Sequence, residues 1–325
     1  MNQPNPVSIS HARLTSARGS VTVLLAAVAL SVLASVQSPP AHACACGCGV
    51  FEVGTASMFP TQRGGMVSLG YDFMNQNGNW SGTSSAPAAD NADQQIRTSF
   101  VTASAQYMFT RAWGVGVEVP YWHRLFRTTD DSGDIEGFTH AALGDIRVRG
   151  TFAGFSADLS TGITAGLKLP TGDYKYANFD RDTEIGTGST DFLLGAYHIG
   201  PLTADRKWTW FVDGQWDQPF TYSGEYHPGS EVDLTAAISH AGYQSGSVNV
   251  APLLAVIGAT RTRDSGADSN PGDSGYDRLL VAPGLDASIG GVRATLTVDL
   301  PLYEKVNGNQ LVAPALFKLV VGHAF

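Results

Sequence analysis

The chain has 325 residues, a formal net charge of −9, only 15% charged residues and 37 glycines. This composition excludes a disordered acidic tail and is unlike that of a helical soluble enzyme, because so much glycine favours strands and turns. No nucleic-acid partner is expected.

The first 43 residues have the organisation of an export signal. Residues 1–20 contain Arg13 and Arg18 and no acid, residues 21–36 are apolar or small, and Ala41-His42-Ala43 supplies the small-x-small cleavage pattern. The apolar run is shorter than the roughly 20 residues that a membrane helix requires, so a retained helix is disfavoured. We therefore predict a cleaved signal peptide over residues 1–43 and an exported mature protein.

Residues 44–63 begin with all three cysteines of the chain, Cys44, Cys46 and Cys48. Such close spacing does not make a disulfide framework. With glycines that let the thiolates converge, the three are candidate ligands for a soft ion, Cu(I) or Zn(II). Two alternatives stay open: a lipid anchor on Cys44, and cysteines that pack as small residues in a plug or pair with a second chain.

From residue 64 onward the sequence repeats segments of about ten residues in which apolar and small or polar residues alternate. This period of two predicts β-strands. About twelve strands are expected, near residues 65–74, 96–109, 113–126, 142–152, 159–169, 190–199, 208–218, 231–242, 249–261, 278–289, 292–303 and 311–325.

The connections between these segments alternate between tight turns, such as Gly290-Gly291, and acidic or glycine-rich loops, such as residues 77–95. That alternation is typical of an outer-membrane barrel with short periplasmic turns and long external loops. An exported β-sandwich or propeller is the soluble alternative, but its outer face would carry more charge. We predict an all-β fold: residues 64–325 form an antiparallel transmembrane β-barrel of about 12 strands, with both termini periplasmic.

The polar face of the segments carries few charges, and acids and bases nearly balance, as expected in a narrow lumen where charges must be paired. Aromatic residues gather at segment ends, as interfacial girdles do. The alternation predicts these lumen-lining residues: Glu118, Asp145, Arg147, Arg149, Lys168, Asp213, Asp217, Asp233, Asp286, Arg293, Asp299 and Lys318. The last segment ends on Phe325, which resembles the terminal aromatic by which such barrels are recognised for assembly.

Four stretches suggest a relationship: "LGDIRVRGTF" (143–152), "GLKLPTGDY" (166–174), "GTGSTDFLLGAYH" (186–198) and "LPLYEKVNGNQLVAP" (300–314). They resemble the outer-membrane family associated with meta-pathway phenol degradation, which is related to channels for hydrophobic compounds. The resemblance implies a transporter-like barrel.

The sequence thus predicts a channel or transporter for a small solute, hydrophobic or aromatic in class, with no enzymatic activity. His123, His140 and His240 are candidate catalytic bases, but no serine can be placed beside them. Asp264, Asp268, Asp273 and Asp277 could supply calcium ligands, although solvated external loops are favoured. Expected partners are outer-membrane lipid, the barrel assembly machinery and the solute. The alternative function is a membrane platform whose cysteines bind a metal or dock a periplasmic partner.

Overall fold

A computed structural model describes residues 63–325 of the chain. The predictions of a signal peptide over residues 1–43, of a cysteine-rich segment over 44–63, and of Cu(I) or Zn(II) ligation by Cys44, Cys46 and Cys48 therefore fall almost wholly outside the described residues. None of the helices within residues 63–325 has the length and apolar character to cross a bilayer.

Twelve antiparallel strands close into a barrel, which confirms the predicted fold class. In chain order they are β1 (Gly64–Gln76), β4 (Asp93–Met108), β5 (Trp113–Thr129), β7 (Ile146–Phe152), β8 (Thr161–Leu169), β9 (Ser189–Pro201), β10 (Trp208–Tyr222), β11 (Glu231–His240), β13 (Val248–Arg261), β14 (Tyr276–Ile289), β15 (Val292–Val312) and β16 (Leu316–Ala324). Each predicted segment overlaps one of these strands.

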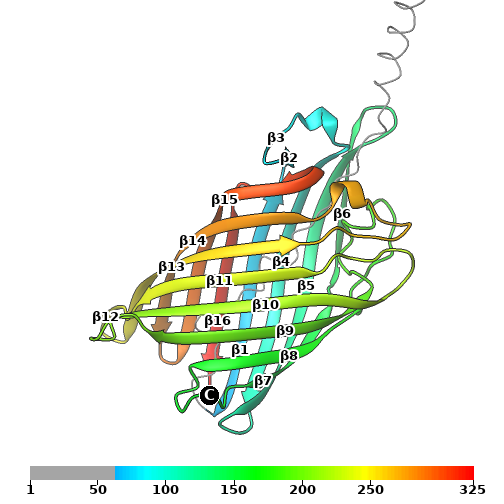
Figure 1. Cartoon of the computed structure of the whole chain (residues 1–325). Helices are drawn as coiled ribbons and strands as arrows, with labels where there is room; N and C mark the ends of the chain where they lie inside the picture. Colours follow the sequence, from blue (N-terminus) through cyan, green and yellow to red (C-terminus); the bar gives the residue numbers. More distant parts are fainter. Residues whose placement is uncertain (1–62) are drawn as a thin grey trace, which may run out of the picture. The chain divides into compact units, whose positions relative to one another are not determined.

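The barrel closes where the first and last strands meet (Figure 1). β1 pairs with β4 along one edge and with β16 along the other, so neither edge is left open. Gly65 and Phe325 exchange two backbone hydrogen bonds of 2.8 Å at the very end of this seam. Because both ends of the barrel chain lie at this seam, they lie at the same end of the barrel.

Short elements outside the barrel ladder extend both of its ends. β2 (Gly78–Gly82) pairs with the long strand β15 and with β3 (Ser84–Ser85), β12 (Tyr243–Ser245) forms a small hairpin with β13, and single 3₁₀ turns occupy η2 (Ala88–Asp90) and η3 (Pro271–Asp273). The sequence did not indicate these elements, since each is too short to show a periodicity.

One wall strand is interrupted. β6 (Ile135–Leu143) pairs with the C-terminal half of β5, and β7 pairs with the N-terminal half. Gly144 and Asp145 lie between β6 and β7. Pro120 lies opposite this break, and its carbonyl oxygen accepts a hydrogen bond from the Gly144 N–H. Proline has no N–H to donate to a neighbouring strand. β5 therefore tolerates it at the point where its neighbour changes from β6 to β7. Within the described residues β6 has a paired strand on only one side.

Alternation sets the two faces of the wall. The outward face is exposed and apolar, as along Val115 and Val117 of β5, Leu194 of β9 and Leu296 of β15. Lipid tails can cover such a face, whereas water could not without cost. The buried face carries the polar and charged residues together with several apolar side chains, and this inward face positions the candidate site.

Candidate functional site: the barrel interior

The structure places the predicted lumen residues as follows. Asp145, Lys168, Asp213, Asp233, Asp286, Asp299 and Lys318 are buried, Glu118, Arg147, Arg149 and Asp217 are half-buried, and Arg293 is exposed. On their strands they alternate with the exposed apolar residues. That these twelve line a path for a solute stays a prediction.

Ion pairs link neighbouring strands across this interior. Lys168 of β8 pairs with Asp191 of β9, and the two stand directly opposite each other in the ladder. Arg149 Nη1 of β7 lies 2.6 Å from Glu118 Oε1 of β5. Since a charge left unpaired inside a protein is costly, these pairs let the interior hold charge.

Two further ion pairs lie near the opposite ends of β14 and β15. Arg278 Nε lies 2.9 Å from Glu304 Oε2 near the long-loop end. Near the other end of the two strands, the Asp286 carboxylate accepts a hydrogen bond from the Arg293 guanidinium, with an Nε–Oδ1 distance of 2.7 Å. Neither Arg278 nor Glu304 was predicted. Arg278 is eight residues from Asp286, so period two places it on the same inward face. Glu304 is five residues beyond Asp299 and faces inward because the register shifts between Pro301 and Tyr303.

Apolar side chains also line the interior. A connected cluster contains side chains from eight wall strands, from the segment between β8 and β9 and from the turn between β15 and β16: Met74, Phe100, Trp122, Ile185, Phe211, Ala237, Ala255, Ile257, Leu280, Ala282, Ala313 and Leu316. Ion pairs and apolar side chains therefore occur on the same wall. A solute inside this barrel would meet both kinds of surface.

The connection from β8 to β9, Pro170–Gly188, packs against the inner face of β5 and β6, and we call it the inner loop. Its Phe179 ring lies 5.4 Å from Phe126, and its Tyr176 ring stacks on His140 at 3.8 Å. Ile185, which is 2% exposed, belongs to the apolar cluster. The inner loop therefore occupies interior space rather than projecting into solvent.

Two wall residues fasten the inner loop. Arg124 of β5 is fully buried, and its Nη1 donates to the carbonyl oxygens of Thr183 at 2.5 Å and Glu184 at 3.3 Å. Asp145 accepts hydrogen bonds from the backbone N–H groups of Gly172 and Thr187, each at 2.9 Å. Asp145 thus holds a loop, a role that the alternation of charges did not indicate. Arg124 was missed, although period two from Trp122 places it inside.

Burial shifts the pKa values of ionisable groups in the inner loop. Burial raises the pKa of Glu184 to about 6, against the opposing effects of the Tyr176 N–H that it accepts and the Arg181 guanidinium 3.1 Å away. Burial also raises the pKa of the Tyr176 hydroxyl above its ordinary value. The uncharged forms of both groups are therefore favoured at this position.

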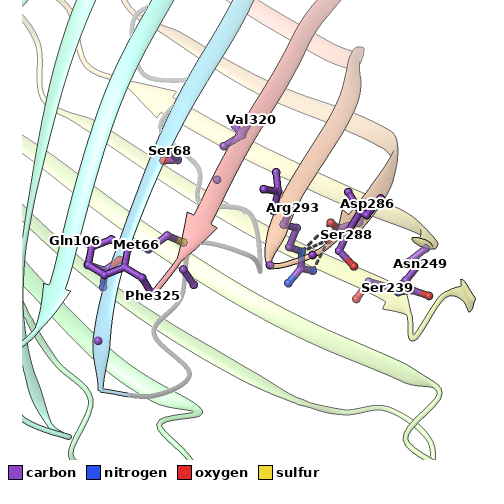
Figure 2. A pocket seen from close by; sticks show the side chains of 18 of the residues that line it. Met66, Ser68, Gln106, Ser239, Asn249, Asp286, Ser288, Arg293, Val320 and Phe325 are labelled. Carbon is purple, nitrogen blue, oxygen red and sulfur yellow. Dashed lines mark hydrogen bonds and ion pairs between the residues drawn. The ribbon is translucent and has the colours of Figure 1, made fainter. Parts of the chain in front are cut away.

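A cavity of about 640 Å³ opens at the end of the barrel where Phe325 and the Gly290-Gly291 turn lie. Figure 2 shows its lining side chains converging from several strands. Apolar and polar side chains contribute about equally. The apolar ones include Met66, Val320 and Phe325, and the polar ones include Ser68, Gln106, Ser239, Asn249, Ser288 and the Asp286–Arg293 pair. A space of this size accommodates a small organic molecule.

The loops at the opposite end do not bring the candidate calcium ligands together. Asp264 is buried rather than solvated, and it accepts from the Tyr226 hydroxyl, the Gly229 N–H and the Arg261 guanidinium. Asp277 pairs instead with Lys305 at 2.9 Å. Residues 63–325 contain no group of three or more metal-ligating side chains.

The histidines that were weighed as bases have other neighbours. His140 Nε2 lies 2.9 Å from Asp173 Oδ2, and the His240 ring stacks on Tyr243. Neither is bonded to a serine hydroxyl. His323, on the outward face, bonds to the Gly291 carbonyl oxygen at the turn that ends β14.

Comparisons with known proteins support the fold. No family model matches the chain, and no curated protein is significantly similar. Among solved structures, the COG4313 outer membrane channel from Pseudomonas putida F1 superposes with a TM-score of 0.64 at 11% identity, covering 84% of this chain and 100% of that one. The β domain of the Bordetella autotransporter BrkA gives 0.51 at 11% identity, over 81% of this chain and 100% of that one. The chain has the fold of outer-membrane β-barrels.

Proposed function

We propose that this protein is an outer-membrane channel that passes a small solute, hydrophobic or aromatic in class, and that it carries out no chemistry itself. The observation that carries the proposal is the interior: a cavity of about 640 Å³ at one end, an inner loop at the other, and a wall that is part apolar and part ion-paired. The similarity to a solved outer-membrane channel supports it. An autotransporter domain is also similar, so the fold alone does not decide.

The proposed orientation puts both termini in the periplasm. The even number of strands brings Gly64 and Phe325 to the same end of the barrel, and the tight Gly290-Gly291 turn lies there too. Outer-membrane barrels keep short turns on the periplasmic side and long loops outside. The inner loop then restricts the external entrance, and the cavity is the periplasmic exit.

Apolar lining argues for an aromatic or aliphatic solute. Phe100 and Trp122 form an edge-to-face pair with ring centroids 4.6 Å apart, and both belong to the interior apolar cluster. Such rings favour contact with another aromatic group by dispersion and ring-edge electrostatics. Meanwhile, because many of the charges are paired within the wall, they need not be balanced by a solute.

The test is single-channel recording of purified protein in planar bilayers. Ser288 lines the cavity, whereas its neighbour Ala287 lies on the opposite face of β14. We expect Ser288→Trp to lower the conductance severalfold, because the indole fills part of the exit, and Ala287→Trp to leave it unchanged. A protein that never conducts, or equal effects of the two substitutions, would contradict an open channel through this cavity.

A second measurement, the reduction of channel current by added solutes, tests the proposed solute class. Phenol and glucose, added separately at equal concentration, are the two probes. We expect phenol to reduce the current more than glucose, since only the former suits the apolar wall. If glucose reduces the current and phenol does not, the interior selects a polar solute, and the hydrophobic class is wrong.

A further inference from the structure

The outward face of β4 and β5 changes character along its length. On β5, exposed Trp113 is followed on the same face by apolar residues up to exposed Tyr121. Eight residues separate the two rings, which is about 26 Å along a strand and about 20 Å along the axis of a barrel with strands tilted by 40°. This matches the apolar band of an outer-membrane barrel, which is bounded by aromatic residues at both interfaces.

Tyr71 of β1 lies in the same cross-strand row as Tyr121, because each stands opposite Val101 of the intervening strand β4, and at a strand tilt of 40° the two rings differ in height by about 6 Å. Both tyrosine rings are exposed, at 43% and 48%. The outward residues that follow them toward the long loops therefore lie at the level of the lipid head groups.

The next outward residues are basic. Arg97 of β4 stands opposite Leu125 of β5, so His123 and Arg127 of β5 are its two diagonal neighbours on the same face. Diagonal partners in a sheet are about 7–8 Å apart, within reach of long side chains. All three side chains are exposed. β4 and β5 are adjacent over this stretch in Figure 1.

This basic cluster, Arg97, His123 and Arg127, has no anionic partner among residues 63–325. No side-chain hydrogen bond or ion pair joins any of the three to another residue within 63–325. Elsewhere on the outward surface a comparable cation is neutralised: Lys305 of β15 pairs with Asp277 of β14. The nearest acidic loop turns on itself, since Asp130 accepts from the N–H groups of Ser132 and Asp134.

We propose that the basic cluster binds the phosphate groups of the glycolipid that forms the outer leaflet of the outer membrane. Two guanidinium groups at adjacent positions repel each other unless an anion lies between them, and arginine binds phosphate in a bidentate manner. His123 adds a ring N–H donor. The glycolipid acyl chains then lie against the apolar band below the two tyrosines.

This site is independent of the channel, because it lies on the outside of the barrel. It does depend on the barrel lying in the outer membrane with its long loops outside. Lipid bound here would order the C-terminal half of β5 and the part of β4 paired with it, next to the strand interruption at Gly144.

The experiment uses the purified full-length protein and measures binding of hexa-acylated lipid A by native mass spectrometry. We expect Arg97→Gln with Arg127→Gln to weaken binding at least tenfold, because each arginine loses a charge-assisted bond to phosphate. The control, Lys207→Gln with Lys305→Gln, removes the same number of positive charges from a turn and from β15, three strands away from β4, and should bind like the wild type. Equal loss in both variants would mean that only net charge matters, and the site would be wrong.

Two further measurements separate the sources of the phosphate. Lipid A from which both phosphates have been removed should bind the wild type at least tenfold more weakly, and equal binding would show that acyl chains alone recognise the barrel. Inorganic phosphate should not compete at millimolar concentration; if it does so fully, the site takes the free anion rather than the lipid. Because these two measurements use the wild-type protein, they decide the matter even if the glutamine variant does not fold.

Discussion

Arg124 should hold the inner loop against the barrel wall. Its Nη1 donates to two loop carbonyl oxygens, those of Thr183 and Glu184, and its Nε donates to Thr98 of β4 at 2.9 Å. In Arg124→Met the methionine keeps an apolar stem but leaves both carbonyls without their donor. A hydrogen bond to a charged group contributes about 1.5–3 kcal/mol, so losing the two loop bonds destabilises the packed loop by at least about 3 kcal/mol. That amount changes the ratio of released to packed loop by about a hundredfold.

Two assays report the release. Amide hydrogen exchange of residues 171–188 should accelerate by about two orders of magnitude in Arg124→Met, and single-channel recordings should show longer openings of higher conductance. Arg127→Met is the matched control, because Arg127 lies on the same strand but faces outward. Heat-modifiable migration of both variants verifies that the barrel has closed. Wild-type exchange in the Arg124→Met loop would refute the reasoning, since the loop would then be held by its apolar contacts and Asp145 alone.

Three further outcomes are expected. Deleting Phe325 removes the hydrogen-bond pair that ends the seam and should lower the amount of heat-modifiable barrel in outer membranes; unchanged folding would exclude an assembly role for this residue. Gly166→Ala places a Cβ 2.1 Å from a carbonyl oxygen of β7 and should lower the thermal midpoint of unfolding, whereas Gly116→Ala, with only a 3.7 Å contact, should leave it nearly unchanged. Burial raises the pKa of Glu184 from 4.5 to about 6, so protonation of this carboxyl stabilises the packed inner loop. The stabilisation, at most roughly 2 kcal/mol, should be complete below pH 4.5 and should be lost as the pH rises through about 6. Amide exchange corrected for intrinsic rates measures that slope. Glu184→Gln should reduce it and leave the part that comes from Asp182 of the same loop, because burial raises the pKa of that carboxyl to about 8.

The strands could be predicted from the sequence because a wall with lipid outside and a lumen inside imposes a period of two on every segment. "VRATLTVDL" of β15 is a clear case: Val292, Leu296 and Leu300 are exposed, and Thr295 and Asp299 between them are buried. The tight turn at Gly290-Gly291 followed from composition in the same way, since both glycines have positive φ, 56° and 84°.

What alternation could not predict is where the wall departs from a regular ladder. Pro120 lies in the middle of β5 opposite the break at Gly144, and Pro219 and Pro301 lie at register shifts. A missing donor is tolerated at a bulge or a changeover as well as at a strand end, and the sequence does not distinguish these cases.

The hydrogen-bond partners of charged loop residues could not be predicted from the sequence either. Asp264 reads as one of several acids in a solvated glycine-rich loop, yet it is 2% exposed and bonds to Tyr226, 38 positions earlier in the chain. Only the packing of two loops brings those groups together. Local composition predicts solvent exposure, and a tertiary contact overrides it.

The two arginines of "RLFR" show how closely register and function are connected in this barrel. Arg124 and Arg127 are three residues apart on β5 and therefore face opposite sides, the first bonded to Thr98 and the inner loop, the second exposed at the proposed lipid level. A slip of one residue in β5 would exchange its two faces. Trp122 would then lie outside the apolar cluster, and the guanidinium of Arg127 would be buried without acceptors. Since an unsatisfied buried charge costs more than a lost surface contact, Arg124 opposes that slip and so also fixes the outward position of Arg127. If so, Arg124→Met should weaken lipid A binding only when it also loosens β5, whereas Arg127→Gln should weaken binding with the inner loop still packed.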